Sequence, residues 1–404
     1  MDKGDKTAPS RRSARGLDWL SFFVADVQTG FGPFVAVYLA SQGWPPGEIG
    51  IVLAIGGIAS VLSEAPGGAL VDAVAAKRLL IGIALAMIAA GALLVALWPS
   101  FWPVAVAHVL HGSTTGIIKP SLAAIGLGLV GHQRLSGRLG RNQRFNSFGN
   151  ATTAGLMGIL GQFATSAAPF FASAALCIPA ALALLSIRGR DIDYAEARSA
   201  PDRANPRKGR RLRETARNRS FHVFVLALLL FHVANASLVP LATGRLGYEH
   251  VSGSVLVTGG AVFVPQAVAA LIATRVGREA DALGRKPLLL VGLGAVAVRA
   301  MLLAVVSAPW GLLPIQLLDG LSAAIIGVMT PLVVADLMRG TGRYNLAQGF
   351  AGMAVGIGGA LSIGTSGYVV EHFGYATAFL GLAFIGSIGV AVLYFLLPET
   401  KPAK

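Results

Sequence analysis

Three ionisable residues of the N-terminal half lie inside long apolar stretches, where charge is costly. Asp26 lies about nine residues from the nearer end of its stretch, Glu64 about seven and Lys119 about eleven, so a rise of ~1.5 Å per residue places them near one level. Lys119 would neutralise one carboxylate, and the other, left unpaired in apolar surroundings, could carry a proton. We therefore expect an Asp26/Glu64/Lys119 cluster that handles protons.

A second pair of opposite charges occurs at matching depth in the C-terminal half. Arg299 lies about eight residues and Asp319 about nine residues from the corresponding ends of their apolar stretches, counted at ~1.5 Å per residue. Ionisable groups in such stretches usually pair with one another, so we expect an Arg299–Asp319 ion pair. This pair could hold two helices together or take part in coupling, and both alternatives stay open.

Two histidines, His108 and His111, are three residues apart and so share one face of a helix. They could form a proton relay, line a polar cavity or pack against the backbone, whereas two ligands without a third are weak support for a metal site. We expect no metal. Further polar side chains within apolar stretches are Gln28, Asn146, Asn150, His232, Asn235, Gln266 and Gln316.

The elements that carry these residues are apolar and long. Apolar residues make up 54% of the 404-residue chain and charged residues 13%, too few charges to cover a soluble domain of this size. Twelve stretches have ~20 or more residues, enough to cross a bilayer as helices. They span 17–40, 48–71, 78–98, 102–130, 145–165, 168–187, 220–243, 252–274, 287–307, 310–337, 344–368 and 373–397.

The basic residues are distributed very unevenly. Thirty of the 33 Lys and Arg residues fall on one side of the expected membrane, as the positive-inside rule requires of the cytoplasmic side. We therefore expect a multi-pass protein of the cytoplasmic (inner) membrane with both termini in the cytoplasm. The net charge of +14 then reflects topology and contact with anionic lipid, and we expect no nucleic-acid partner.

The two halves of the chain resemble each other. Three pairs of short segments recur in the same order, at offsets of about half the chain, and indicate a duplicated six-helix unit. The pairs are 68–72 with 277–281, 116–120 with 327–331, and 144–146 with 343–345. The predicted fold is an all-α membrane protein with twelve transmembrane helices in two pseudo-symmetric six-helix bundles. Its parts are a cytoplasmic N-tail (1–16), an N-terminal bundle (17–187), a basic cytoplasmic linker (188–219), a C-terminal bundle (220–397) and a cytoplasmic C-tail (398–404).

The segment after the eighth apolar stretch carries a family motif. It has the form Gly-x-x-x-Asp-x-x-Gly-Arg-Lys, built from Gly277, Asp281, Gly284, Arg285 and Lys286. The first half carries a worn copy, in which Gly68, Asp72 and Lys77 remain but Ala75 and Ala76 replace Gly and Arg. With twelve helices and a basic central linker, these two copies make the chain resemble the major facilitator superfamily from its first helix to its last.

The resemblance implies contacts at the cytoplasmic side. An Asp at a helix end can accept hydrogen bonds from a neighbouring helix N-terminus and pair with a cation there. We expect Asp72 to face the Arg343 end of helix 11, and Asp281 to face the Arg144 end of helix 5. Together with Lys77 and Arg285, these residues would close the cytoplasmic side while the outer side is open. The alternative is that both motifs are only topological and folding signals.

The resemblance further implies a secondary transporter that moves a small organic solute by alternating access, with the polar intramembrane residues along its path. Proton-coupled efflux is the first choice, and proton-coupled uptake of an organic anion, drawn by Lys119 and the histidine pair, is the alternative. A non-transporting membrane sensor is a further alternative, and no constellation of an enzyme stands out. No Gly-x-x-x-x-Gly-Lys-Ser/Thr motif is present, so ATP is not the direct energy source. We expect a monomer without a cofactor, whose partners are the solute, protons and the bilayer.

Overall fold

The computed structural model describes most of the chain. Described are residues 10–401, except 30–34, 36–37, 40–41, 45, 164, 166, 199–217, 249–253 and 307. All regular secondary structure in this part of the chain is helical. By its contacts the chain divides into two compact units, 1–211 with 338–349 and 212–337 with 350–404. The domain boundaries expected from the sequence stay a prediction.

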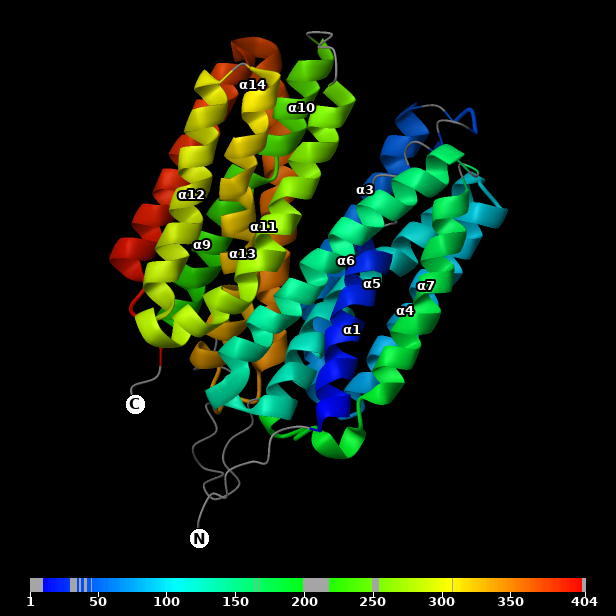
Figure 1. Ribbon diagram of the computed structural model, residues 1–404, viewed down its shortest axis with the longest axis vertical. Coiled ribbons are helices and arrows are strands. Elements are labelled where there is room, and N and C mark those ends of the chain that lie inside the picture. The colour runs from blue at the N-terminus through cyan, green and yellow to red at the C-terminus, as the bar shows by residue number, and fades with distance from the viewer. Residues whose placement is uncertain are drawn as a thin grey trace. The chain divides into compact units, whose positions relative to one another are not determined.

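The described part of the first unit contains the long helices α1 and α3 to α7 (Figure 1). They are α1 (Arg11–Thr29), α3 (Pro46–Ala73), α4 (Lys77–Leu97), α5 (Phe101–Val130), α6 (Leu135–Phe163) and α7 (Ala168–Ser186). Short 3₁₀ turns follow α5 at His132–Arg134 and α7 at Gly189–Asp191 and Glu196–Arg198. Leucine, isoleucine and valine side chains from α1, α4, α5 and α7 form one buried core, centred on residues such as Leu17, Ile81 and Ile125.

The second unit is built from α9 to α14 (Figure 1). Its helices are α9 (Arg219–Asn235), α10 (Leu238–Tyr248), α11 (Ser254–Leu283), α12 (Arg285–Val305), α13 (Leu312–Leu337) and most of α14 (Tyr344–Leu396). Within this unit α13 packs against both α11 and α12. This packing brings the polar residues of α12 and α13 to a common interface.

The outer surfaces of these helices are apolar. Nine spans in the described part of the chain are long and apolar enough to cross a membrane. Large apolar side chains point outward, for example Leu271 at 75%, Phe395 at 78% and Val305 at 82% exposure. Such continuous apolar exposure suits contact with lipid acyl chains and would be untenable in water.

Glycines set the distance between α3 and α5. A Cβ atom added at Gly67 would lie 2.3 Å from the Gly116 carbonyl oxygen, and one at Gly116 would lie 2.1 Å from the Ser63 carbonyl oxygen. At Gly112 the added Cβ atom would lie 2.4 Å from the Gly56 carbonyl oxygen. The two helices therefore pack backbone to backbone, as small residues allow in membranes, and this contact fixes where Glu64 lies relative to α5.

Two helix boundaries differ from those expected. The stretch 220–243, expected to be one helix, is interrupted by a turn between Asn235 and Leu238. There the Ser237 backbone N–H and hydroxyl both contact the Ser362 hydroxyl of α14. The stretches 344–368 and 373–397 are two helices under the label α14, and the break between them lies at Gly374, with φ of 80°, instead of at 369–372. Glycine takes this left-handed conformation without the steric penalty of a side chain.

Candidate functional site

The second unit contains a buried polar network around Arg299 of α12. One guanidinium nitrogen, Nη1, donates to Asp319 Oδ1 of α13 at 2.6 Å and to Asn235 Oδ1 of α9 at 2.8 Å. The other, Nη2, donates to Gln316 Oε1 of α13 at 2.7 Å. Residues 316 and 319 share a face of α13 because they are three apart. The structure thus brings together four of the residues singled out from the sequence.

The members of this network differ in exposure. The Arg299 side chain is fully buried, whereas the Asp319 side chain keeps 16% of its surface exposed. Two buried donors, Arg299 Nε and Gln316 Nε2, make no hydrogen bond within the described part of the chain. A buried ion pair of this kind is stable only while both charges are compensated. The network therefore offers a partly accessible carboxylate and spare donors beside a fixed cation.

In the first unit Glu64 of α3 is buried, with 5% of its surface exposed. Its neighbours on α5 are Thr115, which hydrogen-bonds to it, and Lys119, whose charge attracts it. Lys119 itself is exposed. The structure thus supplies two members of the expected Asp26/Glu64/Lys119 cluster. The side chains of Asp26 and Gln28 lie outside the described part, so their place in it stays a prediction.

The remaining polar residues occupy buried or half-buried positions. His108 is buried, its Nδ1 lies 2.9 Å from the Val104 carbonyl oxygen, and its ring contacts the backbone near Gly56. His232 is half-buried beside the ring of Phe231, with ring centroids 5.0 Å apart. Half-buried positions on α5, α6 and α11 are also taken by His111, Asn146, Asn150 and Gln266.

The worn copy of the motif, at the end of α3, bonds to the start of α14. One carboxylate oxygen of Asp72, Oδ1, accepts from the Asn345 backbone N–H at 3.2 Å and from Asn345 Nδ2 at 2.7 Å. The other, Oδ2, accepts from the Leu346 backbone N–H at 2.8 Å. These N–H groups belong to the first turn of a helix, which has no intrahelical acceptors for them and carries the positive end of the helix dipole. Asp72 therefore caps α14.

Lys77 lies next to this cap. The side chain is fully buried, and its Nζ donates to the carbonyl oxygens of Val71 and Val74, at 3.3 Å for Val74. Val71 lies in the last turn of α3 and Val74 directly follows the helix. Carbonyls at a helix C-terminus have no backbone donor within the helix. Lys77 therefore caps the C-terminus of α3.

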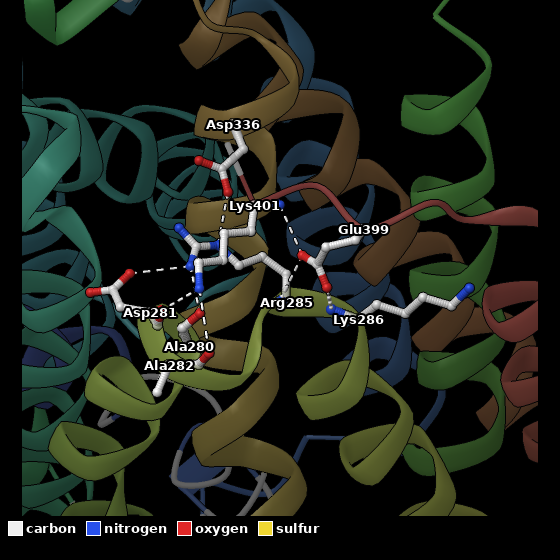
Figure 2. A network of polar contacts seen from close by, with 8 residues as sticks. All are labelled: Ala280, Asp281, Ala282, Arg285, Lys286, Asp336, Glu399 and Lys401. Carbon is white, nitrogen blue, oxygen red and sulfur yellow. Dashed lines mark hydrogen bonds and ion pairs between the residues drawn. The ribbon is translucent and has the colours of Figure 1, made fainter. Parts of the chain in front are cut away.

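The complete copy of the motif forms a denser network (Figure 2). The Arg285 guanidinium contacts Asp336 Oδ2 through Nε at 2.9 Å, and through Nη1 it contacts Asp281 Oδ1 at 3.1 Å and the Ala280 carbonyl oxygen at 2.6 Å. Glu399 accepts from the backbone N–H groups of Arg285 and Lys286 at 2.8 and 3.1 Å. All these contacts lie within the second unit.

The two other gating candidates, Arg144 and Arg343, are exposed. Arg343 directly precedes the first turn of α14, to which Asp72 is bonded. Asp281, half exposed, pairs with Arg285. Its expected position at the Arg144 end of helix 5 stays a prediction, as do the gating roles of all six residues.

Sequence reasoning missed a buried ion cluster at the start of α1. Asp18, with 1% of its surface exposed, pairs with Arg138 and, through Oδ2, with Arg141 Nη2 at 2.7 Å. Both arginines were assigned only to topology. An acidic residue in the first turns of an apolar helix, facing a basic loop, was the available signal. Asp336 and Glu399 were also missed, because each lies near the end of a helix and far along the chain from Arg285.

Comparison with known proteins agrees with this architecture. A family model described as Major Facilitator Superfamily matches residues 18–280 and 261–404. An uncharacterized MFS-type transporter of Mycobacterium tuberculosis, Rv2456c, is 36% identical over 401 residues, which cover 98% of this chain and 96% of the relative. The inner membrane transport protein YajR of Escherichia coli is 27% identical over 125 residues, or 31% of this chain and 27% of YajR.

A solved structure shares the fold. The Escherichia coli fucose:proton symporter FucP superposes with a TM-score of 0.72 over 94% of this chain and 97% of its own, at 16% identity. A second FucP structure, in the outward conformation, matches equally well. Low identity limits this match to the fold, whereas the family model and the mycobacterial relative extend over almost the whole chain. The chain belongs to the major facilitator superfamily.

Proposed function

We propose that this protein is a secondary transporter that moves a small organic solute by alternating access and couples this movement to protons. Two six-helix bundles, 17–187 and 220–397, would move against each other in the cytoplasmic membrane, with both termini in the cytoplasm. The family and the apolar helices support transport as such. The fold of a fucose:proton symporter is compatible with proton coupling.

The observation that carries the coupling is the Arg299 network. Ionisable residues within membrane spans are costly and usually functional, and here a fully buried Arg299 faces a partly exposed Asp319. Protonation of Asp319 would remove the negative charge of the pair. The Arg299 guanidinium would then keep its hydrogen bonds to the side-chain oxygens of Asn235 and Gln316. Such a change alters the packing of α9, α12 and α13 together, which couples proton binding to helix movement.

The alternative role of this network is to hold the three helices together. Buried ion pairs are poor stabilisers compared with well-packed apolar residues, because desolvation offsets their attraction. A structural role therefore predicts that a paired apolar replacement, Arg299→Met with Asp319→Leu, transports normally. A coupling role predicts that the same protein folds but fails to use a pH gradient.

The gating proposal rests on Asp72. Its carboxylate accepts hydrogen bonds from two backbone N–H groups in the first turn of α14. Breaking this cap therefore requires Asp72 to separate from that turn. We assign Asp72, Lys77, Arg144, Asp281, Arg285 and Arg343 to closure of the cytoplasmic side. Wild-type flux in a folded Asp72→Asn/Asp281→Asn double mutant would contradict this assignment.

Efflux of an amphipathic or apolar solute is the direction we favour, because few fixed charges lie within the spans. The alternative is uptake of an organic anion, which the exposed Lys119 on α5 would attract. Substrate panels separate the two, since an anion carrier discriminates by charge and an exporter of apolar solutes by size and hydrophobicity.

The decisive experiment is counterflow in proteoliposomes against a compound panel, with and without a pH gradient. Asp319→Asn is expected to retain exchange and to lose accumulation driven by the gradient. Glu371→Gln, an exposed carboxyl on α14, is the matched control and is expected to accumulate substrate normally. Unchanged accumulation by Asp319→Asn would move the coupling role to Glu64 or Asp26, each tested by the same substitution to the amide.

A further inference from the structure

A groove of about 520 Å³ lies between α1 and α7, apart from the polar residues described so far. Arg12 and Arg15 line one part of it, and Trp19 and Phe23 continue its α1 wall. Its floor is narrow because Gly16 packs on α7, where an added Cβ atom would lie 2.1 Å from Ser186 Oγ. The groove therefore combines two guanidinium groups with an apolar channel.

The spacing of its lining residues follows the two helices. Positions 12, 15, 19 and 23 recur every three or four residues and so form one stripe along α1. From Arg12 to Phe23 the stripe extends for ~16 Å at a rise of ~1.5 Å per residue. On the facing wall, Pro179 and Ala183 of α7 are apolar. A ligand that fits must be anionic at one end and apolar over the ~6 Å from Trp19 to Phe23.

The two arginines are available to a ligand. Both are exposed, and neither makes an ion pair or hydrogen bond with another residue in the described ranges. The hydroxyls of Ser10 and Ser13 donate hydrogen bonds to the nearby carboxylate of Asp191, with 2.6 Å between Ser13 Oγ and Asp191 Oδ2. These hydrogen bonds, helped by the charges of Arg188 and Arg190, lower the pKa of Asp191. Asp191 therefore stays ionised at neutral pH, and its carboxylate contacts these two hydroxyls instead of the guanidinium groups of Arg12 and Arg15.

The aromatic wall is held in place by its neighbours. The Trp19 ring stacks on Phe23 with centroids 6.0 Å apart and meets Phe145 of α6 edge-on at 5.8 Å. Half of the Trp19 surface stays exposed. An indole with an apolar body and a polar N–H favours the boundary between headgroups and acyl chains. Its place, one turn beyond Arg15, matches the order of groups along a phospholipid.

We infer that this groove binds one anionic phospholipid, with the phosphate on Arg12 and Arg15, the glycerol backbone at Trp19, and an acyl chain along Phe23, Pro179 and Ala183. Charge complementarity and the sequence of polar and apolar walls select a lipid over a soluble anion. The occupied groove would fix α1 against α7 at the membrane surface.

Native mass spectrometry of the full-length protein in detergent tests this site. Phosphatidylglycerol is titrated against phosphatidylcholine with the same acyl chains. The wild type is expected to prefer phosphatidylglycerol, and Arg12→Gln/Arg15→Gln is expected to bind it roughly 25-fold more weakly, at roughly fivefold per basic residue near the lipid phosphate. Binding of phosphatidylcholine should change little.

The matched control removes the same two charges elsewhere. Arg11→Gln/Arg278→Gln replaces an exposed neighbour on α1 that does not line the groove and an exposed residue of α11. It should keep the wild-type preference, and Arg12→Lys/Arg15→Lys should keep most of it. If Arg12→Gln/Arg15→Gln and Arg11→Gln/Arg278→Gln lost the same affinity for phosphatidylglycerol, the preference would reflect general surface charge, and the site would be overturned. Glycerol phosphate that competes as well as the intact lipid would overturn the assignment to a phospholipid.

Discussion

The two copies of the loop motif turn the chain from one helix into the next in different ways. In the complete copy α11 ends at Leu283 and α12 begins at Arg285, so Gly284 alone makes the turn, with φ of 96°. In the worn copy α3 ends at Ala73 and α4 begins at Lys77, which leaves three residues between the helices. Alanine at position 75, equivalent to Gly284, disfavours the left-handed conformation. The longer turn is the consequence.

The longer turn also moves the capping cation. Val71 and Ala280 are equivalent positions at the offset of 209 residues, and each offers its carbonyl oxygen to a buried cation. Arg285 donates to Ala280, whereas Lys77, one residue later than the equivalent position, donates to Val71. The helix end is therefore capped in both copies, and Arg285 also binds two carboxylates. Asp72, left without an arginine, caps α14 instead.

The largest effect is expected where the complete copy is broken. Arg285→Gln removes the guanidinium that pairs with the carboxylate of Asp336, whose side chain is only 5% exposed. Loss of one partner of a buried pair costs about 3–5 kcal/mol, which SDS titration of the protein in micelles would detect. Arg275→Gln, which breaks an exposed pair with Glu279, is the control and should cost less than ~1 kcal/mol. Similar losses in both proteins would contradict the burial argument.

A second substitution tests whether Lys77 replaces the missing arginine. Lys77→Met leaves the Val71 carbonyl oxygen without a donor and should cost about 1–3 kcal/mol of unfolding free energy. Ala76→Arg, combined with Lys77→Met, restores the cation at the position of Arg285 and should recover a large part of the loss. Failure of the double variant to recover, alongside a clear loss in the single one, would show that the two turns are not interchangeable.

For the aspartates we expect the larger loss of stability in the worn copy, whereas for the basic residues we expect it in the complete copy. Asp72→Asn removes a buried charge from the N-terminus of α14, where a carboxylate contributes about 0.3–2 kcal/mol through the helix dipole. Asp281→Asn affects a half-exposed carboxylate paired at i,i+4 with Arg285, an interaction of about 0.5 kcal/mol. The same titration should rank Asp72→Asn as the more destabilised variant. The reverse order would contradict the assignment of the α14 cap to Asp72.

The smallest effect concerns pH. Burial alone would raise the pKa of Glu399, but hydrogen bonds from the backbone N–H groups of Arg285, Lys401, Lys286 and Thr400 outweigh it and hold this pKa below its ordinary value. A carboxyl with a lowered pKa stabilises the folded protein above its ordinary pKa of about 4.3 and loses this contribution as the pH falls through the lowered value.

Glu399→Gln should therefore melt lower than the wild type at pH 7, with a difference that shrinks when the pH approaches 4. Thermal unfolding in detergent at several pH values measures this difference. A difference that grows toward low pH would contradict the sign of the shift.

The helical membrane fold and some contacts of the site could be predicted from the sequence. Matching depth in two apolar stretches predicted that Arg299 and Asp319 meet, because the rise of a helix converts residue number into level. It could not predict that Asn235 and Gln316 also accept hydrogen bonds from the guanidinium, since depth gives no rotation about the helix axis. Whether the network couples protons to transport stays a prediction.

Other contacts depend on chain segments that are far apart in sequence. Glu399 reaches the start of α12 from beyond the end of α14, and Asp18 of α1 meets Arg138 and Arg141 of α6. Counting basic residues by membrane side fixes topology and says nothing about such partners. The depth argument placed Lys119 beside Glu64, and the structure brings its charge close to that carboxylate. It could not predict that the Lys119 side chain is exposed while Glu64 is buried.

The glycine contact between α3 and α5 has a consequence for inherited variation. Alanine codons arise from glycine codons by one base change, and at positions 67, 112 and 116 the new methyl group would push directly on main-chain atoms. Such alleles would deplete the protein from cells through misassembly although every polar side chain is intact. A loss-of-function screen would consequently score these three glycines beside Asp319 and Arg285, and only measurement of protein abundance would separate the two groups.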